Sequence, residues 1–486
     1  MPVTGSLRPV FFAIGMMVAV LALAMLIPAT IDTAAGERES ASAFFLSAIV
    51  CFFFGGAVAL ATRSQATSLS PRAAFILTVG SWLALAAAAS IPLRLAEQGM
   101  GWTDAIFESV SGLTTTGSTV LTGLDERPPG FLMWRAILQW IGGIGIIVTA
   151  MAFWPMLGIG GMQLFRMESS DASDKVLPRA TEIAAAISLI YLALTTACAI
   201  AYGLTGMGWI DSIAHAMTTI ATGGYSTSDN SLGAFQANGA DIVAMVFMLL
   251  AALPFGMFLL ALRGKPGAVW GDAQVRGFIG VVLVACVALT VLLAMRDPHQ
   301  EVAAWRLASF NVISIITGTG YATTDYTSWG PPATAAFFLF MFIGGCAGST
   351  TCSVKIFRYQ IAGIALRRYM ENLLRPNAII PLRYNGRAVP DSALHSVFGF
   401  FFVFFAVYVI SAALLSSIGL DTTTALSGAA TSLANVGPGL GDTIGPAGTF
   451  EALPERAKWV LTANMLIGRL EVLAVLVFLS PRFWRG

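Results

Sequence analysis

The sequence has little charge, few histidines and an odd number of cysteines, and each shortage excludes a class of protein. Only 11% of its 486 residues are charged, against about 25% in soluble globular domains, so lipid rather than water surrounds most of the chain. The net charge of +1 provides no basic surface for a nucleic acid. Three histidines without metal-ligand spacing and five cysteines without paired spacing indicate neither a metal centre nor a disulfide framework.

Long apolar runs are abundant instead, with 56% hydrophobic residues and a mean hydropathy of +0.77. Ten runs reach the length needed to cross a bilayer. They cover residues 10–29, 41–61, 73–92, 131–157, 181–204, 242–262, 275–295, 335–359, 393–418 and 459–479. The first run is too long for the apolar part of a signal peptide, so it is also expected to be a transmembrane helix.

Four shorter apolar segments cannot span a bilayer and are predicted to be re-entrant half-helices. They cover residues 103–113, 210–220, 302–315 and 422–433. Asp104, Asp211 and Asp421 stand where three of them begin, so each is predicted to be an N-cap. Each half-helix would aim its partially negative C-terminus at the loop that follows, which favours a cation there.

A polar, glycine-centred loop follows each half-helix. The aligned glycines are Gly117, Gly223, Gly320 and Gly437, which lie 106, 97 and 117 residues apart. Four such loops predict a ring in which backbone carbonyl oxygens replace the water around an ion. The predicted filter residues are Thr115, Thr116, Gly117, Thr222, Gly223, Thr319, Gly320, Asn435, Val436 and Gly437. The alternative interpretation is four tight re-entrant turns that bind no ion.

These elements predict an all-α polytopic membrane protein with ten transmembrane helices and four re-entrant pore half-helices. Four pseudo-symmetric helix–loop–helix units would surround one pore, preceded by an added helix hairpin. The expected divisions are residues 1–68 for the hairpin and 69–165, 166–265, 266–370 and 371–486 for the four units, the last of which begins with a cytoplasmic link.

Basic residues predict the orientation of the chain. With the N-terminus inside the cell, 18 of the 27 lysines and arginines lie at or near the cytoplasmic side, as the positive-inside rule requires. They are Arg8, Arg63, Arg72, Arg166, Lys175, Arg179, Arg263, Lys265, Arg276, Lys355, Arg358, Arg367, Arg368, Arg375, Arg383, Arg387, Arg482 and Arg485. Both termini would be cytoplasmic, and the four polar loops would open to the outside.

Five stretches resemble the Trk/Ktr/HKT superfamily of potassium transporters, and within it the bacterial Trk-type membrane subunits of the TrkH family. They are residues 107–117 (FESVSGLTTTG), 155–163 (PMLGIGGMQ), 342–350 (FIGGCAGST), 435–439 (NVGPG) and 466–471 (LIGRLE). The resemblance implies potassium at Thr116, Thr222, Thr319 and Val436, a location in the bacterial inner membrane, a homodimer, and a cytoplasmic TrkA-like ring of nucleotide-binding regulatory subunits.

One departure from this family falls in the third unit, where a helix is expected to break. The family reads Gly-Ser-Thr-Gly-Gly-Gly before a lysine, whereas residues 348–355 read GSTTCSVK. The break is predicted to be a gate, because irregular backbone at membrane depth is tolerated only where it lines a cavity or is buried. The predicted gate residues are Gly344, Gly345, Gly348, Ser349, Thr350 and Arg469. A simple helix kink is the alternative.

Glu108, Arg469 and Glu471 stand inside apolar segments, where a charge needs a protein or water partner. Arg469 is expected to face the ion pathway as an electrostatic barrier and latch; pairing with Glu471 or extension to the cytoplasm are the alternatives. Glu108 and Glu471 are expected to form structural hydrogen bonds. The alternative for Glu108 is to polarise the outer mouth, and Glu471 either pairs with a nearby base or lies near the cytoplasmic end. The basic stretch 355–387 is either a partner-docking surface or plain positive-inside bias.

The expected function is potassium uptake through a channel-like pore, with the potassium ion as the only cofactor and no organic cofactor on this chain. The alternative is a proton- or sodium-coupled cation symporter of the same fold, which would use intramembrane carboxylates. An enzyme is not expected, because no nucleophile–base or metal set is visible in the sequence.

Overall fold

The computed structural model describes residues 7–63, 70–152, 180–296, 302–378 and 380–485, and in these the chain is almost entirely helical. An N-terminal hairpin comes first, formed by α1 (Arg8–Ala24), α2 (Leu26–Ala35) and α3 (Arg38–Ala61). Gly15 and Gly55 let α1 and α3 cross closely: a Cβ on Gly15 would lie 2.7 Å from the carbonyl oxygen of Gly55. Buried Asp32 attaches the hairpin to the first unit, since its Oδ1 accepts a hydrogen bond of 2.5 Å from the Gly130 amide.

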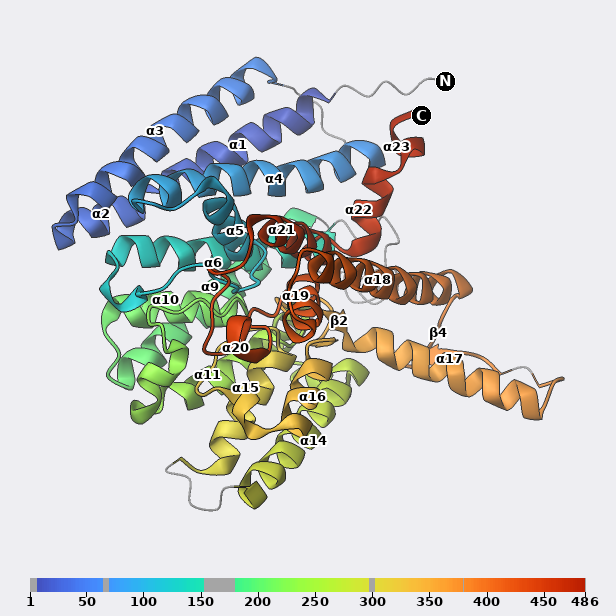
Figure 1. Cartoon of the computed structure of the whole chain (residues 1–486). Helices are drawn as coiled ribbons and strands as arrows, with labels where there is room; N and C mark the ends of the chain where they lie inside the picture. The colour runs from blue at the N-terminus through green and yellow to red at the C-terminus, as the bar shows by residue number, and fades with distance from the viewer. Residues whose placement is uncertain (1–6, 64–69, 153–179, 297–301, 379, 486) are drawn as a thin grey trace.

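Four helix–loop–helix units follow, each with an outer helix, a half-helix and an inner helix (Figure 1). Unit 1 contains α4 (Pro71–Ala96), α5 (Trp102–Leu113) and α6 (Pro129–Ala152). Unit 2 contains α9 (Ala180–Leu204), α10 (Trp209–Ile220), α11 (Ala240–Ala251) and α12 (Phe255–Leu262). Unit 3 contains α14 (Ala273–Arg296), α15 (Ala304–Ile316), α16 (Pro331–Phe340) and α17 (Ile356–Leu374). Unit 4 contains α18 (Asp391–Ser417), α19 (Thr422–Ala434), α21 (Glu455–Arg469) and α22 (Val472–Leu479).

Short elements connect these helices. They are η1 (Leu124–Glu126), η3 (Ser231–Asn238), α13 (Gly267–Gly271), η4 (Tyr326–Trp329), α20 (Gly441–Ile444) and α23 (Pro481–Arg485). Strand β1 (Ile343–Gly344) pairs in parallel with β2 (Val354–Lys355), and β3 (Arg383–Tyr384) pairs antiparallel with β4 (Arg387–Ala388). The start of α1 and the end of α23 lie on the same side of the molecule, and α17 projects away from its body (Figure 1).

Seven described helices are long and apolar enough to cross a membrane, or eight if the bent pair η3 and α11 counts as one span. The other predicted spans, 242–262, 335–359 and 459–479, are each broken into two helices. Pro254 interrupts the first because it has no amide hydrogen to donate. The third breaks at Glu471, whose φ is 63°. Within the described residues, the ten predicted spans are therefore seven continuous and three interrupted segments, and residues 153–157 of the fourth span lie outside the described part.

The half-helices lie within two residues of their predicted bounds, but two of the three predicted N-caps are wrong. Gly101 and Gly208 are the N-caps of α5 and α10. Asp104 and Asp211 lie in the first turns instead, where they accept hydrogen bonds of 2.6 Å from Lys458 Nζ and Thr227 Oγ1. Only Asp421 caps its helix, and its hydrogen bonds with Thr424 hold the pKa of this carboxyl below its usual range.

Some sequence predictions fall outside the described residues. The stretch 155–163 and the basic residues Arg166, Lys175 and Arg179 lie there. Two further residues predicted for the cytoplasmic side, Lys355 and Arg358, are buried in protein.

Candidate functional site

The four loops after the half-helices share one backbone conformation. Each begins with a left-handed residue: Thr115, Thr222, Gly318 and Asn435 have φ of 52°, 50°, 68° and 52°. Two residues later each has a glycine with positive φ: Gly117, Gly224, Gly320 and Gly437 have φ of 86°, 76°, 84° and 115°. The residue between them is Thr116, Gly223, Thr319 or Val436. Four unrelated turns would not repeat this pattern, so the loops are structural copies.

Hydrogen bonds from the middle residues confirm this alignment. Each middle amide donates to the carbonyl five residues earlier in its own half-helix, at 2.9, 2.8, 2.9 and 3.0 Å. The acceptors are Ser111, Thr218, Ser314 and Thr431. The sequence-based alignment of the second loop is therefore wrong by one position, because Gly224 and not Gly223 matches Gly117. The residue matching Thr116 is Gly223, not Thr222.

The loops contact one another in chain order and close a ring. Each glycine faces the middle carbonyl oxygen of the next loop so closely that a side chain would collide with it. A Cβ on Gly117 would lie 2.2 Å from the carbonyl oxygen of Gly223, and a Cβ on Gly224 would lie 1.9 Å from that of Thr319. A Cβ on Gly320 would lie 2.1 Å from the carbonyl oxygen of Val436, and a Cβ on Gly437 would lie 2.9 Å from that of Thr116. Only glycine combines positive φ with this approach, so the ring depends on glycine at all four positions.

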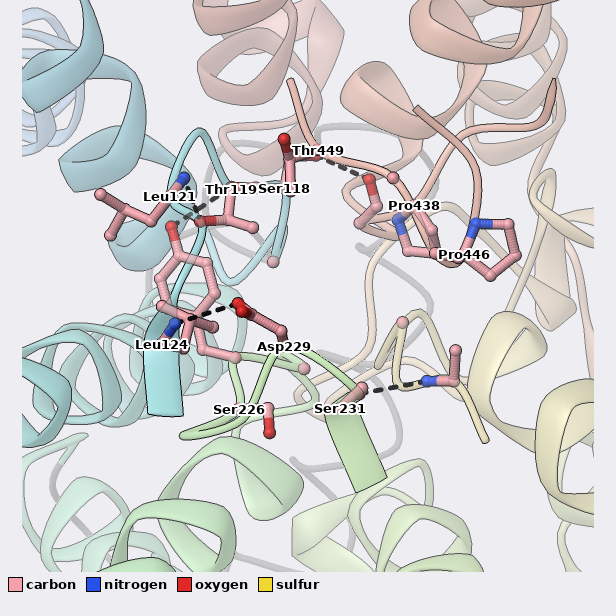
Figure 2. Close-up of a pocket in the computed structure, with 18 of the residues that line it drawn as sticks. Ser118, Thr119, Leu121, Leu124, Ser226, Asp229, Ser231, Pro438, Pro446 and Thr449 are labelled. Atoms are coloured by element: carbon pink, nitrogen blue, oxygen red, sulfur yellow. Dashed lines mark hydrogen bonds between the residues drawn. The ribbon is translucent and has the colours of Figure 1, made fainter. Parts of the chain in front are cut away.

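A polar cavity of about 290 Å³ lies beside the ring (Figure 2). All four units line it, through the ring glycines Gly117, Gly224, Gly320 and Gly437 and through side chains that include Ser118, Asp229 and Thr449. This cavity gives the loops access to solvent on the face that the orientation prediction assigns to the outside.

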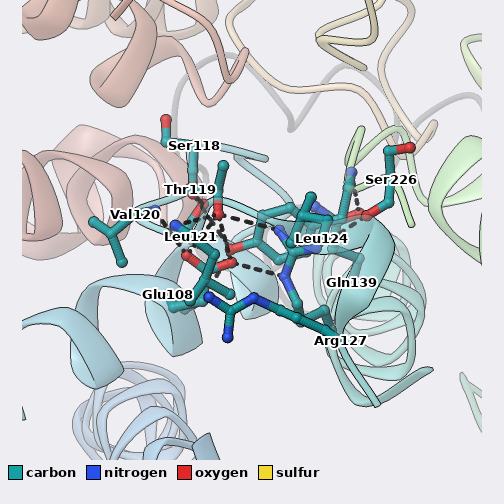
Figure 3. Close-up of polar contacts among 12 residues, drawn as sticks. Glu108, Ser118, Thr119, Val120, Leu121, Leu124, Arg127, Gln139 and Ser226 are labelled. Carbon is teal, nitrogen blue, oxygen red and sulfur yellow. Dashed lines mark hydrogen bonds and ion pairs between the residues drawn. The ribbon is translucent and has the colours of Figure 1, made fainter. Parts of the chain in front are cut away.

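Behind the first two loops lies a buried polar network (Figure 3). The Glu108 carboxylate accepts hydrogen bonds from Arg135 Nε at 2.8 Å, Thr119 Oγ1 at 3.0 Å and the Val120 amide at 3.1 Å. Arg135 also donates to Ser226 O at 3.0 Å and lies 4.0 Å from the centre of the Tyr225 ring. Glu108 thus has the structural hydrogen-bonding role expected of it. Its carboxylate is fully buried, and its charge is paired with that of Arg135.

Arg135 and Gln139, both on α6, were not predicted from the sequence to be site residues. Each is a polar residue within the run 131–157, and polar residues in apolar spans are normally functional. Their four-residue spacing, which places them on one helix face, was the signal that could have identified them.

Two tyrosines pack behind the loops. The Tyr225 hydroxyl donates to Glu108 O at 2.9 Å, and the Tyr321 hydroxyl donates to His215 O at 3.2 Å. Both rings are buried, so they support the loop backbone from behind.

The predicted gate is the irregular segment between α16 and α17. It bonds to the break between α11 and α12: the Cys346 amide donates to Ala252 O at 3.1 Å, and the Phe255 amide to Gly348 O at 2.9 Å. Thr350 Oγ1 donates to Ala251 O at 3.1 Å. The segment is therefore packed into the protein at two helix breaks and is more than a simple kink.

Arg469 connects this segment to the first unit. Its Nη1 donates to Thr350 O at 3.2 Å and contacts Cys352 Sγ, and its Nη2 donates to Gly142 O at 3.1 Å. Cys352 Sγ in turn lies 3.9 Å from Thr115 Oγ1 in the first loop. The guanidinium is buried, which excludes extension to the cytoplasm. Glu471 pairs instead with Arg358 at 2.8 Å, as expected for a nearby base.

The described residues contain no group of three or more His, Cys, Asp or Glu side chains that could hold a metal ion. The ring offers a cation backbone oxygens and hydroxyls, with the C-termini of four half-helices around it. A ring of neutral oxygens inside a helical membrane protein defines the class: an ion-transporting membrane protein.

Comparison with known proteins identifies the family. The family model for TrkH, a cation transport protein, matches residues 40–485. The chain is 44% identical to the Trk system potassium uptake protein TrkI of Halomonas elongata and 36% identical to TrkH of Escherichia coli K12, with at least 98% of each chain covered. The crystal structure of the potassium transporter TrkH from Vibrio parahaemolyticus is 35% identical and superposes with a TM-score of 0.90, covering 98% of this chain and 99% of that one.

The chain belongs to the TrkH family of cation transport proteins. It is a multi-span bacterial membrane transporter and not an enzyme.

Proposed function

We propose that this protein takes up potassium across the bacterial inner membrane through the ring of four loops. The observation that carries the proposal is the fourfold contact between a left-handed glycine and the middle carbonyl oxygen of the next loop. The names of the relatives, which are potassium uptake proteins, support the same ion.

In this proposal, backbone oxygens of Thr116, Gly223, Thr319 and Val436 replace the hydration shell of potassium. Neutral oxygens suit a monovalent cation, because a divalent ion would keep its water or demand carboxylates. The half-helix C-termini add partial negative charge on the same side of the ring. Potassium at Gly223 rather than Thr222 follows from the backbone alignment.

We propose that Arg469 and the segment from Gly344 to Lys355 close the pathway below the ring. The buried guanidinium holds Thr350 and Gly142 together, and its charge opposes a cation that approaches the first loop. Opening would require these hydrogen bonds to break, so movement of α17 provides a route for control from the cytoplasm.

A homodimer and a cytoplasmic nucleotide-binding ring remain proposals, supported by the projecting α17. Its exposed apolar side chains recur at helical spacing, at Leu366, Tyr369, Met370 and Leu373. Arg367 and Arg368 alternate with them. Such a surface suits contact with another protein chain.

A carrier that moves protons on intramembrane carboxylates has less support. Glu108 and Glu471 are each engaged in a buried ion pair with an arginine, so both carboxylates have a structural partner instead of a place along an ion pathway. The uptake pore is therefore the function that the geometry favours.

The decisive experiment measures potassium, rubidium and sodium flux in proteoliposomes for Gly117→Ser and Gly320→Ser. Each new side chain would displace a ring oxygen, and we expect a loss of potassium preference over sodium of about tenfold, which corresponds to about 1.4 kcal/mol. Gly399→Ser is the matched control, because a Cβ on this helical glycine meets nothing within 4 Å. Wild-type selectivity in both filter variants, with normal insertion, would show that the ring is not the filter.

A further inference from the structure

The four loops of the ring are not held in place in the same way. In loops 1 and 3 a serine of the half-helix donates to a carbonyl just beyond the glycine. Ser111 Oγ donates to Ser118 O at 2.6 Å, and Ser314 Oγ donates to Tyr321 O at 2.7 Å. These loops are fastened by their own half-helices.

Loop 2 lacks this fastening. The equivalent residue, Thr218, donates back into its helix, to Ala214 O at 3.1 Å or His215 O at 3.2 Å. Loop 2 also contains two consecutive glycines, Gly223 and Gly224, the least restricted residues in a backbone. In loop 4 the equivalent Thr431 hydroxyl has no hydrogen-bond partner among the described residues either, but loop 2 is the one of these two loops with two consecutive glycines.

Gln139 supplies the missing support from α6, a helix of another unit (Figure 3). Its Nε2 donates to Gly223 O at 2.6 Å, and its Oε1 accepts from the Tyr225 amide at 3.1 Å. The opposite amide orientation would set two donors against each other at Tyr225, so the bonding pattern fixes the assignment. The planar amide thus bridges both sides of Gly224.

This contact singles out one of the four ring oxygens. Among the described side chains, none donates a hydrogen bond to the middle carbonyl of Thr116, Thr319 or Val436, whereas Gln139 holds that of Gly223. Gln139 is fully buried, and a Cβ on Gly223 would lie 2.4 Å from its Cδ, so the side chain has no freedom to leave.

Arg135 keeps α6 itself in register with loop 2. It lies one helical turn before Gln139 and donates to Ser226 O at 3.0 Å while paired with Glu108. The helix therefore contacts loop 2 at residues 223, 225 and 226, through two side chains on one face.

We propose that Gln139 is a specificity-determining positioning residue, which fixes the Gly223 carbonyl oxygen at the distance that distinguishes potassium from sodium. The proposal rests on the proposed function of the ring as the filter. Without the amide, the Gly223–Gly224 peptide can rotate and its oxygen can approach a smaller ion. Loops 1 and 3 need no such residue, because their serines hold them.

The test compares ion selectivity in Gln139→Leu with that in Asn464→Leu, in proteoliposomes containing the full chain. Leucine fills a similar volume without hydrogen bonds. Asn464 is a buried amide on α21 whose side chain, among the described residues, accepts a hydrogen bond from the Ser411 hydroxyl and donates one to Ser432 Oγ, so it is the matched control. We expect Gln139→Leu to lose potassium preference over sodium about tenfold with rubidium flux retained, and Asn464→Leu to keep wild-type selectivity.

A second variant, Gln139→Glu, separates positioning from packing. An ionised carboxylate can still accept from the Tyr225 amide but cannot donate to Gly223 O, whereas a protonated carboxyl can do both. Two arginines lie close to this position on α6, Arg135 one turn before it and Arg469 bonded to Gly142 one turn after it, and their positive charges favour the ionised form although Arg135 is paired with Glu108. We expect selectivity to be low at neutral pH and to recover at acid pH, while the wild type stays unchanged.

The outcomes are distinct. Wild-type selectivity in Gln139→Leu would reject the role of Gln139 if Gly117→Ser loses selectivity in the same assay. If Gly117→Ser also keeps selectivity, the filter assignment itself fails. A loss in Gln139→Leu equal to that in Asn464→Leu, or no recovery of Gln139→Glu in acid, would mean that Gln139 only supports folding.

Discussion

At the scale of single residues, two adjacent glycines in loop 2 have different roles. Gly224 has φ of 76°, and a Cβ there would lie 1.9 Å from a backbone oxygen. Gly223 has no positive φ, and the three atoms nearest to a Cβ there all belong to the Gln139 side chain. The clash at Gly224 involves backbone that cannot move, whereas the clash at Gly223 involves a side chain that a second substitution can shorten. Shortening Gln139 should therefore restore stability to a Gly223 variant but not to a Gly224 variant.

We therefore expect Gly224→Ala to lower thermal stability in detergent, with left-handed strain of about 1–2 kcal/mol added to the clash. Gly223→Ala should also lower it, but Gly223→Ala combined with Gln139→Ala should recover most of the loss. Gly224→Ala combined with Gln139→Ala should recover nothing. Equal rescue of both glycine variants would contradict the alignment of loop 2.

The sequence predicts the role of a residue best where a polar or glycine residue interrupts an apolar segment. The glycine-centred loops and the buried charges Glu108, Glu471 and Arg469 were visible because polar residues are rare in this sequence. The alignment of loop 2 was not, because Ala221-Thr222-Gly223-Gly224 offers two glycines and only φ distinguishes them. Asp104 and Asp211 were misassigned as N-caps because their partners, Lys458 and Thr227, come from other parts of the chain.

At the scale of helices, hydropathy located the half-helices well but could not show which spans are broken. A run such as 459–479 is apolar enough to read as one helix, although it turns at Leu470-Glu471. The break becomes stable through contacts that no local pattern encodes, because Glu471 pairs with Arg358 of α17 at 2.8 Å. Three interrupted spans meet near the ring, so the breaks concentrate where the pathway needs polar backbone.

The interrupted helices lead to a prediction for Arg469→Ala. A unit charge 4 Å from a cation raises its energy by about 4 kcal/mol at the effective dielectric of protein sites, so removing the guanidinium should raise basal potassium flux several-fold. Arg469→Lys should have a milder effect, because the charge stays while hydrogen bonds to Thr350 or Gly142 are lost. Arg263→Ala, at an exposed arginine after α12, is the control. Reduced flux in correctly assembled Arg469→Ala would rule out the barrier role.

At the scale of the whole molecule, charge distribution and shape are both consistent with the cytoplasmic face that the sequence predicts. The projecting α17 and the β3–β4 hairpin carry Arg367, Arg368, Arg375, Arg383 and Arg387. The start of α1 and the end of α23 lie on one side of the molecule, as an even number of crossings requires (Figure 1). The ten predicted spans, three of them interrupted in the described residues, are consistent with this arrangement.

Cysteine labelling on intact cells tests this orientation directly, because the five native cysteines are all buried and should give little background. Thr122, after the first loop, and Asn377, after α17, are both exposed. With the basic surfaces inside, a membrane-impermeant maleimide should label Thr122→Cys on intact cells, whereas Asn377→Cys should react only after permeabilisation. The reverse pattern would place the arginines of α17 outside, where the positive-inside rule does not allow them, and the polar cavity beside the ring would then open to the cytoplasm.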